Sequence, residues 1–185
     1  MKRSIAPFIA VGLAAAVACP NVFAGSSPGE VDFGQFAELA GNAKYVDIQV
    51  SHTLISLASH FVQKEQPEVA SLLRSVELVR LNVIGLNDEN RDEMVKRVRE
   101  IRVRLDQQGW QRVVVVQQKS GEDVGIYVKT GAGDAIQGVV LTVLDGKQEA
   151  VLVNIVGDIK PSQISALGEA LDIDALKKAG DAVKK

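Results

Sequence analysis

Residues 136–156, Ile136-Gln-Gly-Val-Val-Leu-Thr-Val-Leu-Asp145-Gly146-Lys-Gln-Glu149-Ala-Val-Leu-Val-Asn-Ile-Val156, decide the fold of this 185-residue chain. Two apolar runs flank an Asp-Gly pair, which is a strong hairpin signal because a type I′ turn needs positive φ at its central residues. The sequence therefore predicts strands at 136–145 and 149–156 that pair antiparallel.

Two more strands precede this hairpin, at 112–118 and 124–129. The connections between the strands carry Ser120-Gly121 and Gly131-Ala132-Gly133, and small residues of this kind are typical of tight turns. Four short strands in quick succession, joined by such turns, predict an antiparallel meander over residues 112–156.

The rest of the chain alternates between helical and strand periodicity. The predicted elements outside the meander are helix 33–40, strand 45–50, helix 54–62, helix 68–74, strand 76–84, helix 89–107 and two helices after residue 162. The longest of them, 89–107, has its apolar stripe at Met94, Val98, Ile101 and Leu105. In helix 54–62 the predicted stripe is Leu54, Ile55, Ala58, Phe61 and Val62.

These elements predict an α+β fold in a single domain, with a mixed or mostly antiparallel sheet of five or six strands and helices mainly on one face. The strands at 76–84 and 112–118, together with the helix between them, are also consistent with a right-handed crossover unit.

Three of the strands are apolar on both faces. Residues 113–116, 139–144 and 151–156 show no clean alternation, and such strands are normally covered on both sides. Two explanations stay open at this stage. Either the terminal helices cover the second face, or a face or edge of the sheet serves self-association or a protein partner.

The N-terminus carries an export signal. Lys2 and Arg3 precede an apolar run and then Val22-Phe23-Ala24, which is the pattern of a secretory signal peptide over residues 1–24. We expect a flexible tether at 25–31, where Gly-Ser-Ser-Pro-Gly begins, and a single domain at 32–185. Cleavage after Ala24 leaves 161 residues (185 minus 24) with 19 basic and 23 acidic side chains. This net charge of −4 does not favour nucleic acid.

Cys19 is the single cysteine of the chain and lies within this leader. Its context, Ala16-Val17-Ala18-Cys19, resembles a bacterial lipobox, although Ala16 stands where a larger aliphatic residue is usual. Soluble export and lipid anchoring through Cys19 are therefore both retained, and contact with a membrane is expected only if Cys19 is lipidated.

No catalytic, cofactor-binding or metal-binding residue is predicted. His52 and His60 are the two histidines, and a spacing of eight puts them about 12 Å apart along a helix, too far for one metal ion. Gly131-Ala132-Gly133 begins like a phosphate-binding loop but lies in a hairpin. Asp158 is interpreted as a residue after the last strand that caps the next helix.

The long helix carries a cluster of cations, namely Lys96, Arg97, Arg99, Arg102 and Arg104. Acidic residues are interleaved with these cations and lower the net positive charge of the helix surface. We therefore interpret the cluster as a solvated face. An acidic partner or a lipid headgroup is the alternative. Trp110 follows this helix, and we expect it in the core instead of at a ligand-binding surface.

The passage Val151-Leu-Val-Asn-Ile-Val-Gly-Asp-Ile-Lys-Pro-Ser-Gln-Ile, taken with the exported N-terminus and with Val76-Glu-Leu-Val-Arg-Leu, resembles the bacterial domain-of-unknown-function family 4252. The resemblance extends over about residues 30 to 175. It implies a small exported protein of unknown role, in a family many of whose members are assigned as lipoproteins. It carries no catalytic residues over to this chain.

The functional expectation is a non-catalytic periplasmic or envelope protein that binds a protein or surface partner, with a homodimer through the apolar sheet surface as one form of this. A small-ligand or lipid carrier with an apolar cavity of several hundred Å³ is the first alternative. An enzyme of an unfamiliar type is the second alternative.

Overall fold

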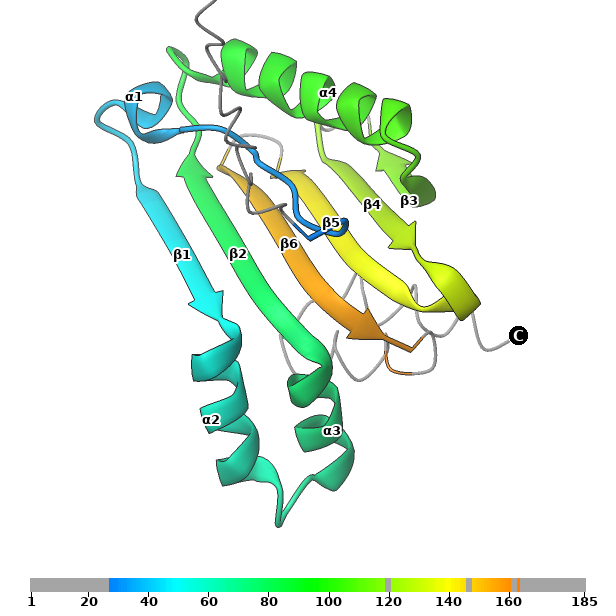
Figure 1. Ribbon diagram of the computed structural model, residues 1–185. Coiled ribbons are helices and arrows are strands. Elements are labelled where there is room, and N and C mark those ends of the chain that lie inside the picture. Colours follow the sequence, from blue (N-terminus) through cyan, green and yellow to red (C-terminus); the bar gives the residue numbers. More distant parts are fainter. Residues whose placement is uncertain (1–26, 119–120, 146–147, 161–162, 164–185) are drawn as a thin grey trace, which may run out of the picture.

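The computed structural model describes residues 27–118, 121–145, 148–160 and 163. Its centre is one six-stranded antiparallel sheet in the order β1-β2-β6-β5-β4-β3. Together with four α-helices, this sheet confirms the predicted α+β class (Figure 1). The strands are β1 (Tyr45–Ser51), β2 (Val76–Gly85), β3 (Gln111–Gln117), β4 (Asp123–Thr130), β5 (Ile136–Asp145) and β6 (Glu149–Ile159).

The predicted meander is present. Strands β3 to β6 pair in sequence, and the β5–β6 hairpin is closed by the backbone N–H of Gln148, which donates to the Asp145 carbonyl oxygen at 2.7 Å. Strand β6 runs three residues beyond the predicted end at 156. The interpretation of Asp158 as a cap after the strand is therefore wrong, because this residue lies within β6.

The helices are α1 (Ala37–Ala40), α2 (His52–Val62), α3 (Pro67–Ser75) and α4 (Arg91–Gln107), and a 3₁₀ turn (Ala132–Asp134) connects β4 to β5. Helix α4 lies across one face of the sheet (Figure 1). Its predicted stripe is confirmed, since Met94, Val98, Ile101 and Leu105 are at most 1% exposed. Helices α2 and α3 form a hairpin that extends beyond the end of β1 and β2.

Two local predictions differ from the structure. Strands β2 and β3 run in the same direction, but three strands separate them, so they are not the neighbours that a simple crossover unit needs. The helix predicted at 33–40 is reduced to α1, because Phe33 and Phe36 are anchored in the core by an irregular backbone. The two helices predicted after residue 162 lie outside the described residues.

The segment predicted as a flexible tether at 25–31 is held on the sheet from Gly29 to Val31. Asn154, fully buried in β6, accepts the Val31 N–H at 2.8 Å and donates to the Gly29 carbonyl oxygen at 3.0 Å. A Cβ at Gly138 would lie 2.6 Å from the Gly29 Cα, so glycine in β5 lets this segment approach closely. The tether prediction is wrong here because it weighed local composition alone.

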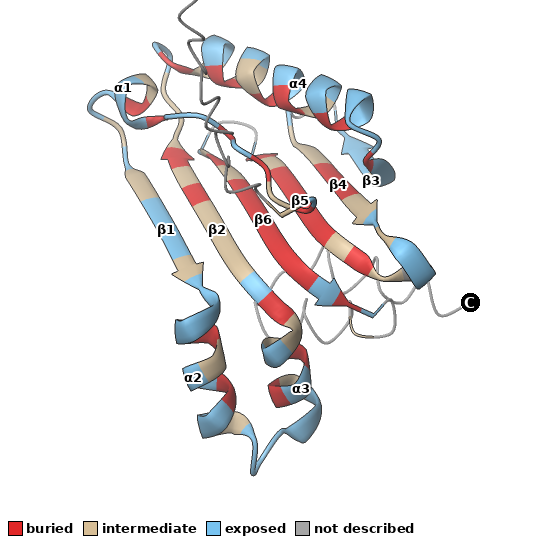
Figure 2. Cartoon of the chain, viewed as in Figure 1, coloured by how far each residue is buried: buried red, intermediate tan, exposed pale blue. Residues whose placement is uncertain are grey.

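The core forms on both faces of the central strands. Figure 2 shows the most buried residues along β5 and β6, whereas the edge strands β1 and β3 are more exposed. One cluster joins α4, the N-terminal segment and one sheet face, and it includes Trp110 as predicted. The other cluster joins the opposite face to Ile55 of α2 and Leu72 of α3.

Candidate interaction surfaces and a polar groove

The sheet face opposite α4, which we call the second face, is apolar along its whole width. The strand registers align its residues in rows, since directly opposed residues share a face. The first two rows cross all six strands and the third crosses five. They are Val46-Val83-Val151-Val143-Val124-Val116, Ile48-Leu81-Val153-Leu141-Ile126-Val114 and Val50-Val79-Ile155-Val139-Val128.

The face under α4 is mixed instead. Its opposed residues include Asp47 with Asn82 and Arg80 with Asn154, and the N-terminal segment contacts the second pair, since Asn154 binds Val31 and Arg80 binds Glu30. The exposure of the second face rises towards the sheet edges. Ile126, Ile155 and Val139 are each 1% exposed, whereas Ile48 on β1 is 42% exposed. The most exposed apolar positions therefore lie at the rim of this face, whereas valines on the inner strands, such as Val143 and Val151, are half-buried.

Helix α2 carries the largest exposed apolar side chains. Leu54, Leu57 and Phe61, which we call the α2 stripe, are 56%, 55% and 77% exposed. At about 100° per residue they fall within about 60° of one another and about 150° from the buried pair Ile55 and Ser59. Of the stripe predicted for this helix, only Ile55 is buried.

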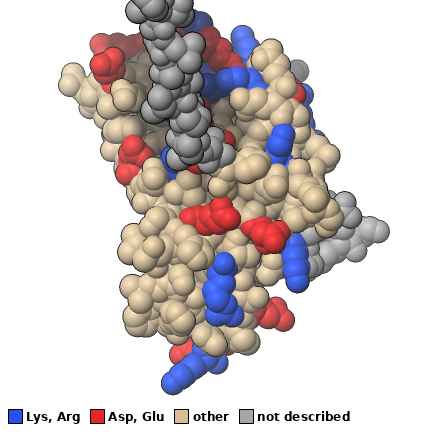
Figure 3. Space-filling model, viewed as in Figure 1, with Lys and Arg blue, Asp and Glu red and all other residues tan. Residues whose placement is uncertain are grey.

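The α2 stripe points away from the rest of the hairpin. Helix α2 packs on α3, which lies on the side away from the free edge of β1 in Figure 1. The stripe is opposite the buried side of α2 and therefore faces the same side as that free edge. Figure 3 shows an area without charged side chains over α2 and the adjoining end of β1. An exposed apolar area of this kind is typical of an interaction site.

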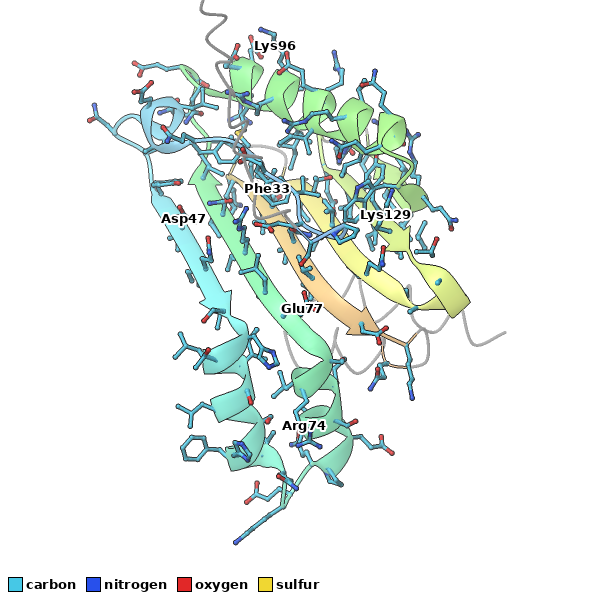
Figure 4. The ribbon with its side chains drawn as sticks, viewed as in Figure 1. Phe33, Asp47, Arg74, Glu77, Lys96 and Lys129 are labelled. Atoms are coloured by element: carbon cyan, nitrogen blue, oxygen red, sulfur yellow. The ribbon has the colours of Figure 1, made fainter. Side chains whose placement is uncertain are left out.

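The basic cluster of α4 is not uniformly solvated, and for Arg102 the prediction is wrong. The Arg102 side chain is 11% exposed and lies between α4 and the sheet. Its Nη1 binds Asp123 Oδ1 at 2.7 Å and its Nε donates to Thr142 Oγ1 at 3.0 Å. Lys96 points away from the sheet, as Figure 4 shows. Arg104, although exposed, donates from Nη2 to the Asp32 carbonyl oxygen at 3.0 Å, so the cluster includes cations that contact other segments of the chain as well as solvated ones.

Gly125 makes room for this buried ion pair. A Cβ at this position of β4 would lie 3.0 Å from both Arg102 Nε and Thr142 Oγ1. The guanidinium therefore lies against the bare backbone of the strand. A glycine inside an apolar strand is a sequence signal for such a close approach, and it is the one signal that identifies this cluster.

A groove of about 190 Å³ opens beside the pair, and residues from α4, β3, β4 and β5 line it. Its charged residues are largely paired, because Asp123 binds Arg102 and Asp106 binds Arg112 at 2.6 Å. The remaining nitrogen of Arg102, Nη2, has no partner in the described structure, but solvent does not reach it, so it is not presented to a ligand in the groove.

Tyr127 forms part of the same groove and lies next to Arg112, whose guanidinium is 5.7 Å from the ring centre. Burial raises the pKa of Tyr127 above its ordinary value, and the positive charges of Arg112 and Arg102 oppose this shift. A phenol with a raised pKa stays neutral at physiological pH, so this tyrosine is not poised as a base or a nucleophile.

A second groove, of about 300 Å³, lies between the N-terminal segment and the end of β6. Glu77 and Asp158 contribute carboxylates to it, and Ser27 Oγ donates to Glu77 at 3.1 Å. His52 and His60 are both exposed, and His52 Nδ1 lies 3.0 Å from the Val76 carbonyl oxygen. Within the described ranges, no three His, Cys, Asp or Glu residues gather as metal ligands would.

Fold and surfaces together define an α+β protein built on one antiparallel sheet, with apolar surface at a helix and at the sheet rim. The chain belongs to the family "Domain of unknown function (DUF4252)", whose model matches residues 38–167. This confirms the family resemblance of the sequence. No curated protein and no solved structure matches the chain. Among the described helices, none combines the length and the apolar character needed to cross a bilayer.

Proposed function

We propose that this protein is a non-catalytic, exported protein of the cell envelope that binds a protein partner through the α2 stripe. The observation that carries the proposal is the exposure of Leu54, Leu57 and Phe61 along one side of a protruding helix. Single exposed apolar residues are common, but three large ones on one helical face are typical of a binding surface.

The spacing of the stripe specifies the kind of partner. Positions 54, 57 and 61 follow the i, i+3, i+7 pattern with which an amphipathic helix fits into an apolar groove of another protein. The hairpin from His52 to Ser75 carries Lys64 and Arg74 against Glu65 and Glu68, and so has no basic excess. Binding to an anionic lipid surface needs such an excess, and this favours a protein over a membrane.

Export rests on the leader at residues 1–24, with its charged start, apolar run and small residues before the cleavage site. The second route, lipid anchoring at Cys19, places the same domain on a membrane surface without changing the proposed binding face.

A carrier function has less support. A carrier needs an enclosed apolar cavity, whereas the two grooves described above are lined in part by charged groups such as Asp106, Asp123, Glu77 and Asp158. An enzymatic function would need clustered groups with matched pKa values, and the paired charges around Arg102 are better explained as structural.

Positional photo-crosslinking tests the proposal. The chain is produced in bacteria with its own leader, and a photoreactive side chain replaces Leu57 in one strain and Glu68 on α3 in another. We expect one discrete protein adduct from position 57 and none from position 68. Adducts to lipid alone, or equal adducts at both positions, would contradict the proposal.

The identified partner then gives a quantitative test. With both proteins purified, Phe61→Ser should weaken binding about 30-fold, as expected for loss of an aromatic anchor worth about 2 kcal/mol. The substitution should leave the fold intact because this side chain is 77% exposed. Glu68→Ser is the matched control and should bind like the original chain.

A further inference from the structure

Within the described part of the chain, strand β1 is a free edge of the sheet, and its hydrogen-bonding groups can be assigned residue by residue. The Gly85 N–H donates to the Lys44 carbonyl oxygen at 2.7 Å, which makes these two residues a hydrogen-bonded pair of the β1–β2 ladder. Because such pairs alternate in an antiparallel ladder, Val46, Ile48 and Val50 direct their backbone groups to β2. The N–H groups of Tyr45, Asp47, Gln49 and Ser51 therefore point outward, as do the carbonyl groups of the first three.

This edge lacks the devices that protect the other edge of the sheet. β1 pairs with β2 over seven residues without a register shift, it contains no proline, lysine or arginine, and its one charged residue is Asp47. At the opposite edge, β3 carries a bulge between Arg112 and Val114 and an arginine within the strand. Bulges and edge cations prevent strand pairing, so the sheet is protected at β3 and open at β1.

We propose that two copies of this chain pair through β1, antiparallel about a two-fold axis at Ile48, and thereby join their sheets. In this register Asp47 lies opposite Gln49 of the other copy, and Tyr45 lies opposite Ser51. All four outward-facing residues of each copy then take part in the new ladder, and the Asp47 carboxylate lies opposite the Gln49 amide. Ile48 lies opposite its own copy, and Val46 lies opposite Val50.

The neighbouring registers are less favourable. Because the outward-facing residues must meet one another, the two-fold axis passes through one residue and the register moves in steps of two. An axis at Asp47 sets two carboxylates directly opposite each other, which is destabilising. An axis at Gln49 shortens the overlap. The register centred on Ile48 therefore combines the longest ladder with no opposed like charges.

The pairing also accounts for the exposure of the rim of the second face. Val46, Ile48 and Val50 are the β1 ends of the three apolar rows, and Ile48 is 42% exposed in the single chain. In the pair these residues contact their counterparts, so that each row continues into the other copy. The α2 stripe begins at Leu54, beyond the end of β1, so the β1 ladder itself uses none of the stripe residues.

A proline at position 49 tests the backbone part of this proposal. Gln49→Pro removes an N–H that points outward, so the β1–β2 ladder keeps its hydrogen bonds. The protein is produced with its own leader, and sedimentation equilibrium measures its oligomeric state. We expect a dimer for the original chain and for Gln49→Thr. For Gln49→Pro we expect a dissociation constant raised at least about tenfold, with an unchanged circular dichroism spectrum.

Disulfide trapping tests the register without depending on the fold of a proline variant. In a Cys19→Ser background, Ile48→Cys places two thiols in a non-hydrogen-bonded pair with Cα atoms about 4.5 Å apart, close enough for a disulfide. Asp47→Cys places them on a diagonal about 7–8 Å apart. We expect oxidation to yield a covalent dimer from the first variant and little from the second.

Three results would each overturn the proposal. They are a monomeric original chain at tens of micromolar, a dimer that Gln49→Pro leaves unchanged, and equal trapping at positions 47 and 48. None of them bears on the α2 stripe, whose crosslinking is measured at position 57. Failure of the pairing and failure of the proposed function are therefore distinguishable.

Discussion

Arg102 is a cation of α4 whose charge is compensated inside the protein. Asp123 and Thr142 bind its guanidinium, and Gly125 leaves the space that it occupies. Such a buried ion pair adds little to folding stability compared with apolar residues of the same shape. Removal of one partner, however, leaves a buried charge without compensation and is destabilising. The residue therefore contributes mainly to the position of α4 on the sheet.

Arg102→Met should lower the free energy of unfolding by about 3 kcal/mol. This is the lower end of the range for a broken buried pair, because Asp123 is still 22% exposed to solvent. Arg99→Met, one turn earlier on the exposed side of α4, is the control and should change stability by no more than about 0.5 kcal/mol. Urea unfolding followed by circular dichroism measures both, and equal losses would contradict a structural role for Arg102.

The two tyrosines predict a loss of stability in alkali. Burial is the main cause that raises the pKa of both Tyr45 and Tyr127, and Asp47 adds to the shift of Tyr45. Because the folded state holds these protons more tightly, the stabilisation is complete below the ordinary pKa of 10.0 and is lost as the pH rises from there through the raised value.

Ultraviolet titration checks this directly, since tyrosinate has its own absorbance and the chain has two tyrosines. With Tyr45→Phe, the remaining signal belongs to Tyr127 and should titrate above 10.0 in the folded protein and near 10.0 in urea. A Tyr127 signal that titrates at or below 10.0 in the folded state would show that the two arginines outweigh burial.

At the scale of the element, α4 is the helix whose packing follows most directly from its sequence. Its four apolar residues at helical spacing are the four that the sheet buries, whereas Val103 lies off the stripe and is 49% exposed. Ile101→Ala should cost about 2–5 kcal/mol, the usual range for truncation of a buried isoleucine.

Val103→Ala on the same helix is the matched control, and we expect a change within about 0.5 kcal/mol. Thermal unfolding of both variants gives the comparison. If the two truncations cost the same, α4 does not pack on the sheet through the face described.

Local sequence signals explain which elements could be predicted: turn residues between apolar runs for the meander, and helical spacing for α4. The strands of the meander and the stripe of α4 carry repeated local signals, and the structure contains them. The α2 stripe shows the limit, because Leu54, Leu57 and Phe61 have the spacing of a core helix although they face outward. Periodicity finds the apolar side of a helix, but it does not tell whether this chain or a partner covers it.

Long-range polar contacts could not be predicted from the sequence, because they produce no periodic pattern in it. Asn154 binds the N-terminal segment across 123 residues, and the Arg102–Asp123 pair joins a helix to a strand that it does not adjoin in sequence. Neither contact has a periodic signature. The glycines at 125 and 138 are the local sequence features associated with these contacts, because a side chain at either position would collide with the neighbouring group.

At the scale of the whole molecule, the leader predicts where the protein works. If residues 1–24 are removed on export, mass spectrometry of the purified protein should find an N-terminus at Gly25. A diacylated Cys19 would instead show lipid anchoring. An intact leader on protein from the cytosol would contradict export.

The central claim is that this chain acts through its exposed apolar helix and not through a reactive site. Crosslinking in living cells at position 57, with position 68 on α3 as the reference, tests it most directly. The account predicts one protein partner joined at 57 and absent at 68. Adducts at neither position, or the same adducts at both, would contradict it.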